Sequence, residues 1–158
     1  MNIVTLDVET TTREKPNGAW TPSPFFKNML VSVGYKRVTD IGVDYLCFHH
    51  EEKPTTAGGF EQLRSTLDDC DLLIGHNIKF DLIWLRECGW SYQGKLYDTM
   101  IGEYILAGSR RWPLSLAALA EKYEVGSKKK DLVQPYLDDG ITFDKIPYNI
   151  VEEYGKED

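Results

Sequence analysis

An alternating strand that ends in two acids constrains this chain more than any other feature. Residues 3–10 read Ile-Val-Thr-Leu-Asp-Val-Glu-Thr. Because the side chains of a strand alternate between its faces, Asp7 and Glu9 lie on one face with their Cα atoms roughly 6–7 Å apart. Two negative charges at that distance repel by about 2–3 kcal/mol at an effective dielectric of about 20. A divalent cation held by oxygen ligands would remove the repulsion. If the strand ended at Leu6, with both acids in a solvated turn, no cation would be needed.

The length and composition indicate one domain, residues 1–158, because 158 residues with 42% hydrophobic content can bury a real core. Cys47, Cys70 and Cys88 are odd in number and form no close pair. This pattern favours a reducing compartment and argues against a disulfide scaffold or a zinc knuckle. No apolar run approaches the ~20 residues that span a bilayer, and no secretory signal is visible. We expect a cytoplasmic protein without a membrane partner.

The net charge of −7 leaves the partner open. Phosphate recognition usually needs a basic face, so this balance argues against nucleic-acid binding. Acidic clusters that hold metal ions are the exception, because the bound cations reverse the local sign of the charge.

The order of the predicted elements indicates an α/β fold with a mixed sheet. The strands are predicted at residues 3–9, 29–35, 44–49, 71–75 and 95–97. The helices are predicted at residues 60–67, 78–87, 99–107, 114–123 and from 147 to the end. The first three strands fit an antiparallel meander and the later, short strands alternate with helices. Residues 10–28 are predicted to form a long loop.

Two further polar sites stand out on predicted helices. Asp81 sits at the edge of the apolar stripe of its helix, where an acid is costly unless it is paired or bound to a cation. Asn77 fits the N-cap of the same helix, and a capping amide can still contact a ligand. Tyr154 and Asp158 are four residues apart and share a helical face, although that spacing alone proves nothing.

Other candidate residues have structural interpretations of comparable weight. We interpret His76 as a packing residue at a strand end and Asp98 as a helix cap. The basic run 128–130 fits either phosphate contacts or a solvated loop. Arg110 and Arg111 are predicted to lie in a loop. We hypothesise that they stack on bases or contact phosphates of a substrate.

Together the three acidic sites resemble the three motifs of the DEDD exonucleases. They read Asp7-Val8-Glu9-Thr10, His76-Asn77-Ile78-Lys79-Phe80-Asp81 and Tyr154-Gly155-Lys156-Glu157-Asp158. This superfamily is DnaQ-like and has a ribonuclease H-like fold. No histidine follows His76, so the chain resembles the tyrosine-bearing (DEDDy) branch. It is most similar to the 3′–5′ proofreading domain of phage-type, family A (polymerase I-like) DNA polymerases. Stretches 97–100 and 115–120 carry further resemblance.

The resemblance implies a fold of three antiparallel strands plus short parallel strands, flanked by helices. It also implies two Mg²⁺ or Mn²⁺ ions held by four carboxylates, those of Asp7, Glu9, Asp81 and Asp158. Asp7 would contact both ions, Glu9 and Asp158 the ion of the nucleophile, and Asp81 the other.

The same resemblance implies roles for three more residues. Tyr154 would orient the attacking water, because a phenol with a pKa near 10 is a poor general base at neutral pH. Thr10 and Asn77 would contact the terminal nucleotide.

The implied function is metal-dependent 3′–5′ hydrolysis of phosphodiester bonds at the 3′ end of single-stranded DNA. Its purpose would be proofreading for a DNA polymerase domain, in the same chain or a separate protein, in a bacterial or phage-infected cell. One alternative is a ribonuclease D-like exoribonuclease, which tolerance of the 2′-hydroxyl would distinguish. Another is a non-catalytic nucleic-acid-binding module of the same fold.

Two features depart from the resemblance. Some relatives place an apolar wedge directly after the first motif, where this chain has Thr11-Thr12-Arg13. The wedge would then come from elsewhere or be an arginine stack. The chain also stops at Asp158, a proposed metal ligand. A ligand on a frayed last turn would be poorly held. We therefore expect either a domain truncated at the third motif, from which a downstream polymerase domain would be missing, or a weakened site.

Overall fold

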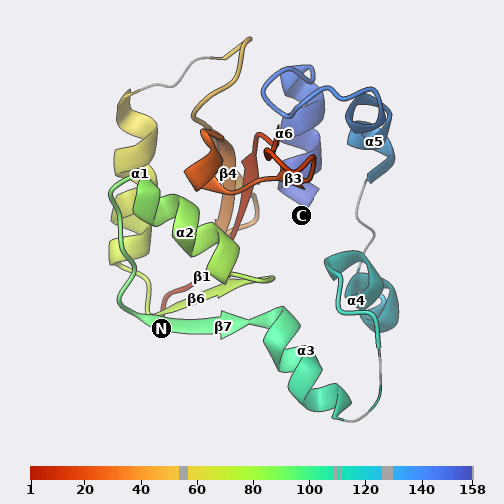
Figure 1. Ribbon diagram of the computed structural model, residues 1–158. Helices are drawn as coiled ribbons and strands as arrows, with labels where there is room; N and C mark the ends of the chain where they lie inside the picture. Colours follow the sequence, from red (N-terminus) through yellow and green to blue (C-terminus); the bar gives the residue numbers. More distant parts are fainter. Residues whose placement is uncertain (54–56, 109, 111, 126–129, 158) are drawn as a thin grey trace.

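The computed structural model describes residues 1–53, 57–108, 110, 112–125 and 130–157. Its centre is a mixed five-stranded sheet with helices on both faces (Figure 1). The strand order is β5 (Asp44–Cys47), β4 (Leu30–Arg37), β1 (Ile3–Thr10), β6 (Leu72–Gly75) and β7 (Lys95–Asp98). β4 runs antiparallel to both β1 and β5, whereas β6 runs parallel to both β1 and β7. The predicted α/β class, with an antiparallel meander and short parallel strands, is confirmed.

The alternation predicted for the first strand is present in β1. Val4, Leu6 and Val8 are at most 5% exposed and belong to the main hydrophobic core. Asp7 and Glu9 lie on the opposite face and are half-buried. Because residues of one strand face alternate sides, this register places both acids on the face away from the main core.

The helices lie on two sides of the sheet. They are α1 (Ala57–Asp68), α2 (Lys79–Glu87), α3 (Thr99–Ala107), α4 (Leu116–Tyr123), α5 (Lys130–Asp138) and α6 (Tyr148–Glu157). α1 and α2 lie on one side and α5 and α6 on the other, whereas α3 continues from the end of β7 and α4 lies below α5 (Figure 1). No helix in the described part of the chain is long and apolar enough to cross a membrane.

α6 approaches the sheet closely because two glycines meet there. Gly34 on β4 is the register partner of Asp7, and a methyl group at Gly34 would lie 2.7 Å from the carbonyl oxygen of Gly155. A methyl group at Gly155 would overlap the ring of Tyr45. The missing side chains let the last turn of α6 lie next to the strand that carries Asp7.

The start of α6 is held by the loop after β5. The Glu52 carboxylate accepts a hydrogen bond of 2.9 Å from the backbone N–H of Tyr148, in the first turn of α6. His50 is buried and its Nε2 lies 2.8 Å from the carbonyl oxygen of Ile146, while its Nδ1 accepts from the N–H of Glu52. A carbonyl can only accept and an N–H can only donate, so in this pair of contacts Nε2 acts as the donor and Nδ1 as the acceptor.

Two predictions from local pattern were wrong, and one helix was missed. The predicted loop 10–28 contains a two-stranded hairpin of β2 (Arg13–Glu14) and β3 (Trp20–Thr21), followed by a 3₁₀ helix, η1 (Pro24–Phe26). α5 was not predicted, because Pro135 lies inside it and proline usually interrupts a helix. Asn77 does not cap α2: the N-cap position is Ile78, and Asn77 has a left-handed backbone with φ of 58°.

We predict that Gly34→Ala destabilises the fold by about 1–3 kcal/mol, because the new methyl group pushes α6 away from the sheet. Urea unfolding measures the change. Gly42→Ala is the matched control, since a methyl group there meets nothing within 4 Å. Equal unfolding free energies for the two variants would contradict the packing described for Gly34.

Candidate active site

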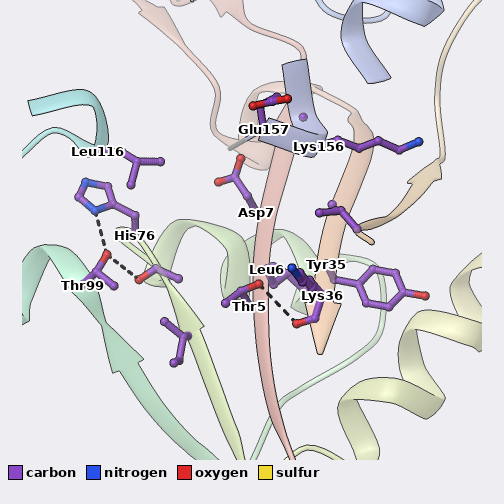
Figure 2. Close-up of a pocket in the computed structure, with 15 residues that line it drawn as sticks. Thr5, Leu6, Asp7, Tyr35, Lys36, His76, Thr99, Leu116, Lys156 and Glu157 are labelled. Atoms are coloured by element: carbon purple, nitrogen blue, oxygen red, sulfur yellow. Dashed lines mark hydrogen bonds between the residues drawn. The ribbon is translucent and has the colours of Figure 1, made fainter. Parts of the chain in front are cut away.

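Asp7 lies in a cleft of about 280 Å³ between the sheet, the start of α3 and α4, and the end of α6. Figure 2 shows its carboxylate directed toward the last turn of α6, where Lys156 and Glu157 lie. Leu116 and His76 border the cleft on the side of α4 and β6. The acid predicted to contact both metal ions therefore faces an open cleft.

Glu9 stands two residues further along the same face of β1, opposite Ser32 on β4. The Tyr45 hydroxyl lies within hydrogen-bond distance of both Ser32 Oγ and the Val151 carbonyl oxygen, the latter at 3.1 Å. The carbonyl can only accept, so Tyr45 donates to Val151 and Ser32 donates to Tyr45. Burial, reinforced by the charge of Glu9, raises the pKa of Tyr45. This bridge links α6 to the strands beside Glu9.

Asp81 is fully buried, with 1% of its surface exposed, rather than at the edge of the apolar stripe as predicted. Its Oδ1 accepts a hydrogen bond of 3.1 Å from the backbone N–H of Val8. β6 pairs with β1 only as far as Thr5, so the Val8 N–H lies beyond the parallel ladder and needs another acceptor. Asp81 supplies it, and this contact brings the α2 carboxylate to the strand of Asp7.

The second oxygen of Asp81, Oδ2, is buried without a hydrogen bond to any residue that the structure describes. Burial first, and the charge of Asp7 second, raise the pKa of Asp81 from 3.8 to about 8. A buried carboxyl in this state binds a proton at neutral pH unless a cation stabilises its charge.

These observations fit the divalent metal ions implied by the sequence. An unpartnered, buried carboxylate oxygen next to a second carboxylate is a hard-oxygen donor set, which Mg²⁺ and Mn²⁺ favour. Within the described ranges, no three His, Cys, Asp or Glu side chains already form a metal-binding group. Asp158, the fourth predicted carboxylate, lies outside the described residues.

The third motif reaches the cleft through its backbone and its charged residues. Gly155, Lys156 and Glu157 line the cleft of Asp7. Tyr154 is 6% exposed and packs against Phe143, with ring centroids 5.7 Å apart, in a second hydrophobic cluster between α5 and α6. Its ring is thus fixed by packing, and its role in orienting water stays a prediction.

Asp98 caps two helices rather than the one that was predicted. Its carboxylate accepts hydrogen bonds from the N–H groups of Met100 and Ile101 at the start of α3. It also accepts from the N–H groups of Asn77 and Ile78, at 3.0 and 3.1 Å, at the start of α2. One carboxylate therefore fixes the second motif to α3, which explains why Asn77 needs no capping side chain.

The remaining predicted contacts are scattered. Thr10 is 6% exposed and lies on the strand face away from Asp7. Asn77 lines a shallow pocket with Ser115 and Leu116. Arg110 is exposed between α3 and α4. Arg111 and residues 128–129 lie outside the described residues, and Lys130 begins α5. Substrate contacts by these residues stay predictions.

Sequence reasoning missed several residues of the cleft. His76, predicted to pack at a strand end, lines it and has Nδ1 3.0 Å from the hydroxyl of Thr99, which donates to the Gly75 carbonyl. Leu116 and Glu157 also line it. Glu157 belongs to the third motif, so its place near the site could have been predicted. Leu116 lies in the stretch 115–120 that resembles the family, but only the tertiary fold shows that it is near Asp7.

We predict that metal-free protein loses stability as pH rises from about 4 to about 8. In that window folded Asp81 keeps a proton that the unfolded chain releases, so unfolding becomes easier as pH rises. Asp81→Asn removes this ionisation and should raise Tm in EDTA at pH 8 by about 5 °C, with a smaller gain at pH 5.

Thermal unfolding in EDTA at both pH values measures the effect. Asp40→Asn, which removes one exposed carboxylate from the turn between β4 and β5, controls for the change in net charge. A Tm gain for Asp81→Asn that is the same at pH 5 and pH 8 would contradict the buried, proton-binding carboxyl.

Comparisons with known proteins agree with this geometry. Residues 26–158 match the family model of the 3′–5′ exonucleases. The match begins after β1 and does not include Asp7 or Glu9. The pairing of β1 in the sheet is what places these two acids at the site. No curated protein sequence matches the chain.

Solved structures show the same fold. NrnC of Brucella melitensis with bound Mg²⁺ is 18% identical, with a TM-score of 0.52 over 79% of this chain and 54% of that one. The apo form of a nuclease is 17% identical, with a TM-score of 0.54 over 81% of this chain and 54% of that one. The chain thus spans about half the length of these proteins, and its mixed sheet flanked by helices is consistent with a ribonuclease H-like fold. Because the family model covers most of its residues, the chain belongs to the 3′–5′ exonuclease family of enzymes.

Proposed function

We propose that this chain is a divalent-metal-dependent exonuclease that removes nucleotides from the 3′ end of single-stranded DNA. The observation that carries the proposal is the buried, unpartnered Oδ2 of Asp81 beside the charge of Asp7. Such an arrangement destabilises the metal-free fold and becomes favourable only with a cation. Family membership supplies the reaction class, and Mg²⁺ is bound by NrnC, which has the same fold.

Four carboxylates would hold two Mg²⁺ or Mn²⁺ ions: those of Asp7, Glu9, Asp81 and Asp158. When bound, the metal ions would lower the pKa of a bound water, which favours hydroxide near neutral pH. They would also supply positive charge that stabilises the leaving 3′ oxygen. Asp7 faces the cleft and would lie nearest the scissile phosphate. Tyr154, fixed by Phe143, would orient the attacking water by a hydrogen bond.

The polar groups around the cleft would bind the end of the strand. Lys156, which pairs with Glu152 at 2.7 Å, and Lys36 line the cleft and would supply positive charge for phosphate oxygens. Asn77 and Thr10 would contact the terminal nucleotide, and Arg110 and Arg111 the strand further on.

Proofreading for a family A DNA polymerase, in the same chain or as a partner, is the purpose we propose. Its support is the motif pattern of the sequence. The carboxylate site does not read the sugar, so the choice of DNA over RNA depends on contacts to the 2′ position.

The test is digestion of a 5′-labelled single-stranded 20-mer with Mg²⁺ or Mn²⁺. We predict a ladder that shortens from the 3′ end, is abolished by EDTA, and falls at least 10³-fold for Asp7→Asn, an isosteric change that removes one ligand charge. Asp40→Asn is the control for loss of an exposed acid and should keep full activity.

The same assay with an RNA 20-mer separates the substrates. Faster digestion of RNA would replace the DNA assignment by an exoribonuclease. No digestion of either strand with both metals, by folded protein, would contradict the proposed function.

A further inference from the structure

A second cleft lies between the β2–β3 hairpin and the loop that joins α5 to α6. Its volume is about 490 Å³, and it is separate from the cleft of Asp7. Its lining includes Thr12, Arg13, Glu14, Trp20, Asp144 and Lys145. The hairpin precedes the residues that match the exonuclease family model, so the match assigns it no role.

The base of this hairpin is rigid. Thr11 is 4% exposed, donates to Asn28 Oδ1 at 3.1 Å and accepts from the N–H of Met29 at 2.8 Å. The Asn28 side-chain amide donates to the Thr21 carbonyl at 2.8 Å. A buried polar network of this kind fixes the backbone on both sides of the cleft. The cleft wall is therefore formed before any ligand arrives.

Trp20 is presented on this rigid wall with 62% of its surface exposed. It pairs in register with Glu14, and Arg13 pairs with Thr21 on the same two-residue ladder. This register places Trp20 and Glu14 on one face of the ladder and Arg13 on the other, and both Trp20 and Arg13 line the cleft. The exposed indole of Trp20 is a flat surface on which a base can stack. Aromatic stacking contributes about 1–3 kcal/mol per base and tolerates any base, because every base has a π-face.

The charge of this segment differs from that of the chain. Residues 11–28 contain Arg13, Lys15 and Lys27 against Glu14, a net charge of +2 within a chain of −7. Lys145, which forms an ion pair with Glu51 at 3.7 Å, adds an exposed ammonium to the cleft. Glu14 and Asp144 also line the cleft, so binding there would depend more on stacking than on charge.

The cleft continues the first acidic motif. Thr11 and Thr12 directly follow Thr10, the last residue of that motif, and an extended backbone rises roughly 3.3 Å per residue. Thr12 is therefore about 10 Å from Glu9 along the chain. A strand whose 3′ end lies at Asp7 can reach Trp20 with nucleotides that precede the terminal one.

We propose that the β2–β3 hairpin is a binding site for single-stranded nucleic acid, with Trp20 stacking on a base upstream of the 3′ end and Arg13 contacting the adjacent phosphate. The proposal rests on the proposed exonuclease function, since it extends the substrate path from that site. It places the stacking side chain on the hairpin and not directly after the first motif.

The test is binding of 5′-fluorescein-labelled dT12 and dT2, followed by fluorescence anisotropy in EDTA at 50 mM salt. Trp20→Ala should weaken binding of dT12 by roughly 5- to 100-fold, with a much smaller effect on dT2, and Trp20→Phe should restore most of the loss. Phe25→Ala is the matched control: Phe25 is 73% exposed in the same segment but does not line the cleft. It should bind both oligonucleotides like the wild type.

The outcomes separate the two proposals. Wild-type protein that binds dT12 through Trp20 but digests no strand would contradict the exonuclease and keep the binding site. Active protein in which Trp20→Ala binds dT12 as tightly as wild type would overturn the binding site alone. Equal losses for Trp20→Ala and Phe25→Ala would also overturn it, and so would absence of dT12 binding by the wild type, whereas the exonuclease is tested by digestion.

Discussion

The hydrogen bond from the Val8 N–H to Asp81 is the interaction on which the site depends. β1 is the centre of the sheet, but its parallel partner β6 ends too early to satisfy Val8. A side chain from α2 completes the ladder instead, and the group that does so is a carboxylate. The fold therefore buries an acid next to Asp7. The pKa of Asp81 is raised because, without a cation, a buried negative charge beside a second carboxylate is unfavourable.

The opposite side of β1 is built by close backbone approach. Gly34 and Gly155 allow α6 to lie against β1 and β4. The Tyr45 hydroxyl donates a hydrogen bond to the Val151 carbonyl of α6, which links this helix to the strands beside Glu9. Side chains from three distant parts of the sequence thus meet around one strand. Packing or a backbone hydrogen bond fixes each of these side chains in place. Charged groups need such support to be positioned precisely.

Much of this arrangement could be predicted from local sequence. The alternation of β1 gave its buried face, and Asp98 was recognised as a cap. Its second cap could not be predicted, because α2 starts about twenty residues earlier and meets Asp98 only in the sheet. The helical wheel placed Asp81 at the edge of the apolar stripe. A wheel contains no information on the N–H of Val8, which β6 leaves without an acceptor and which Asp81 bonds instead. The hairpin strands have two residues each, too few for a periodic signal, and Pro135 concealed α5.

We propose that Asp7 and Asp81 form a cation site, and that in the metal-free fold a proton on Asp81 takes the place of the cation. Isothermal titration of Mn²⁺ at pH 7, in buffers of different ionisation enthalpy, tests it most directly. The pKa of Asp81 lies near 8, so Mn²⁺ binding should release close to one proton, and Asp81→Asn should abolish that release. Binding without proton release, or release that persists in Asp81→Asn, would contradict the account.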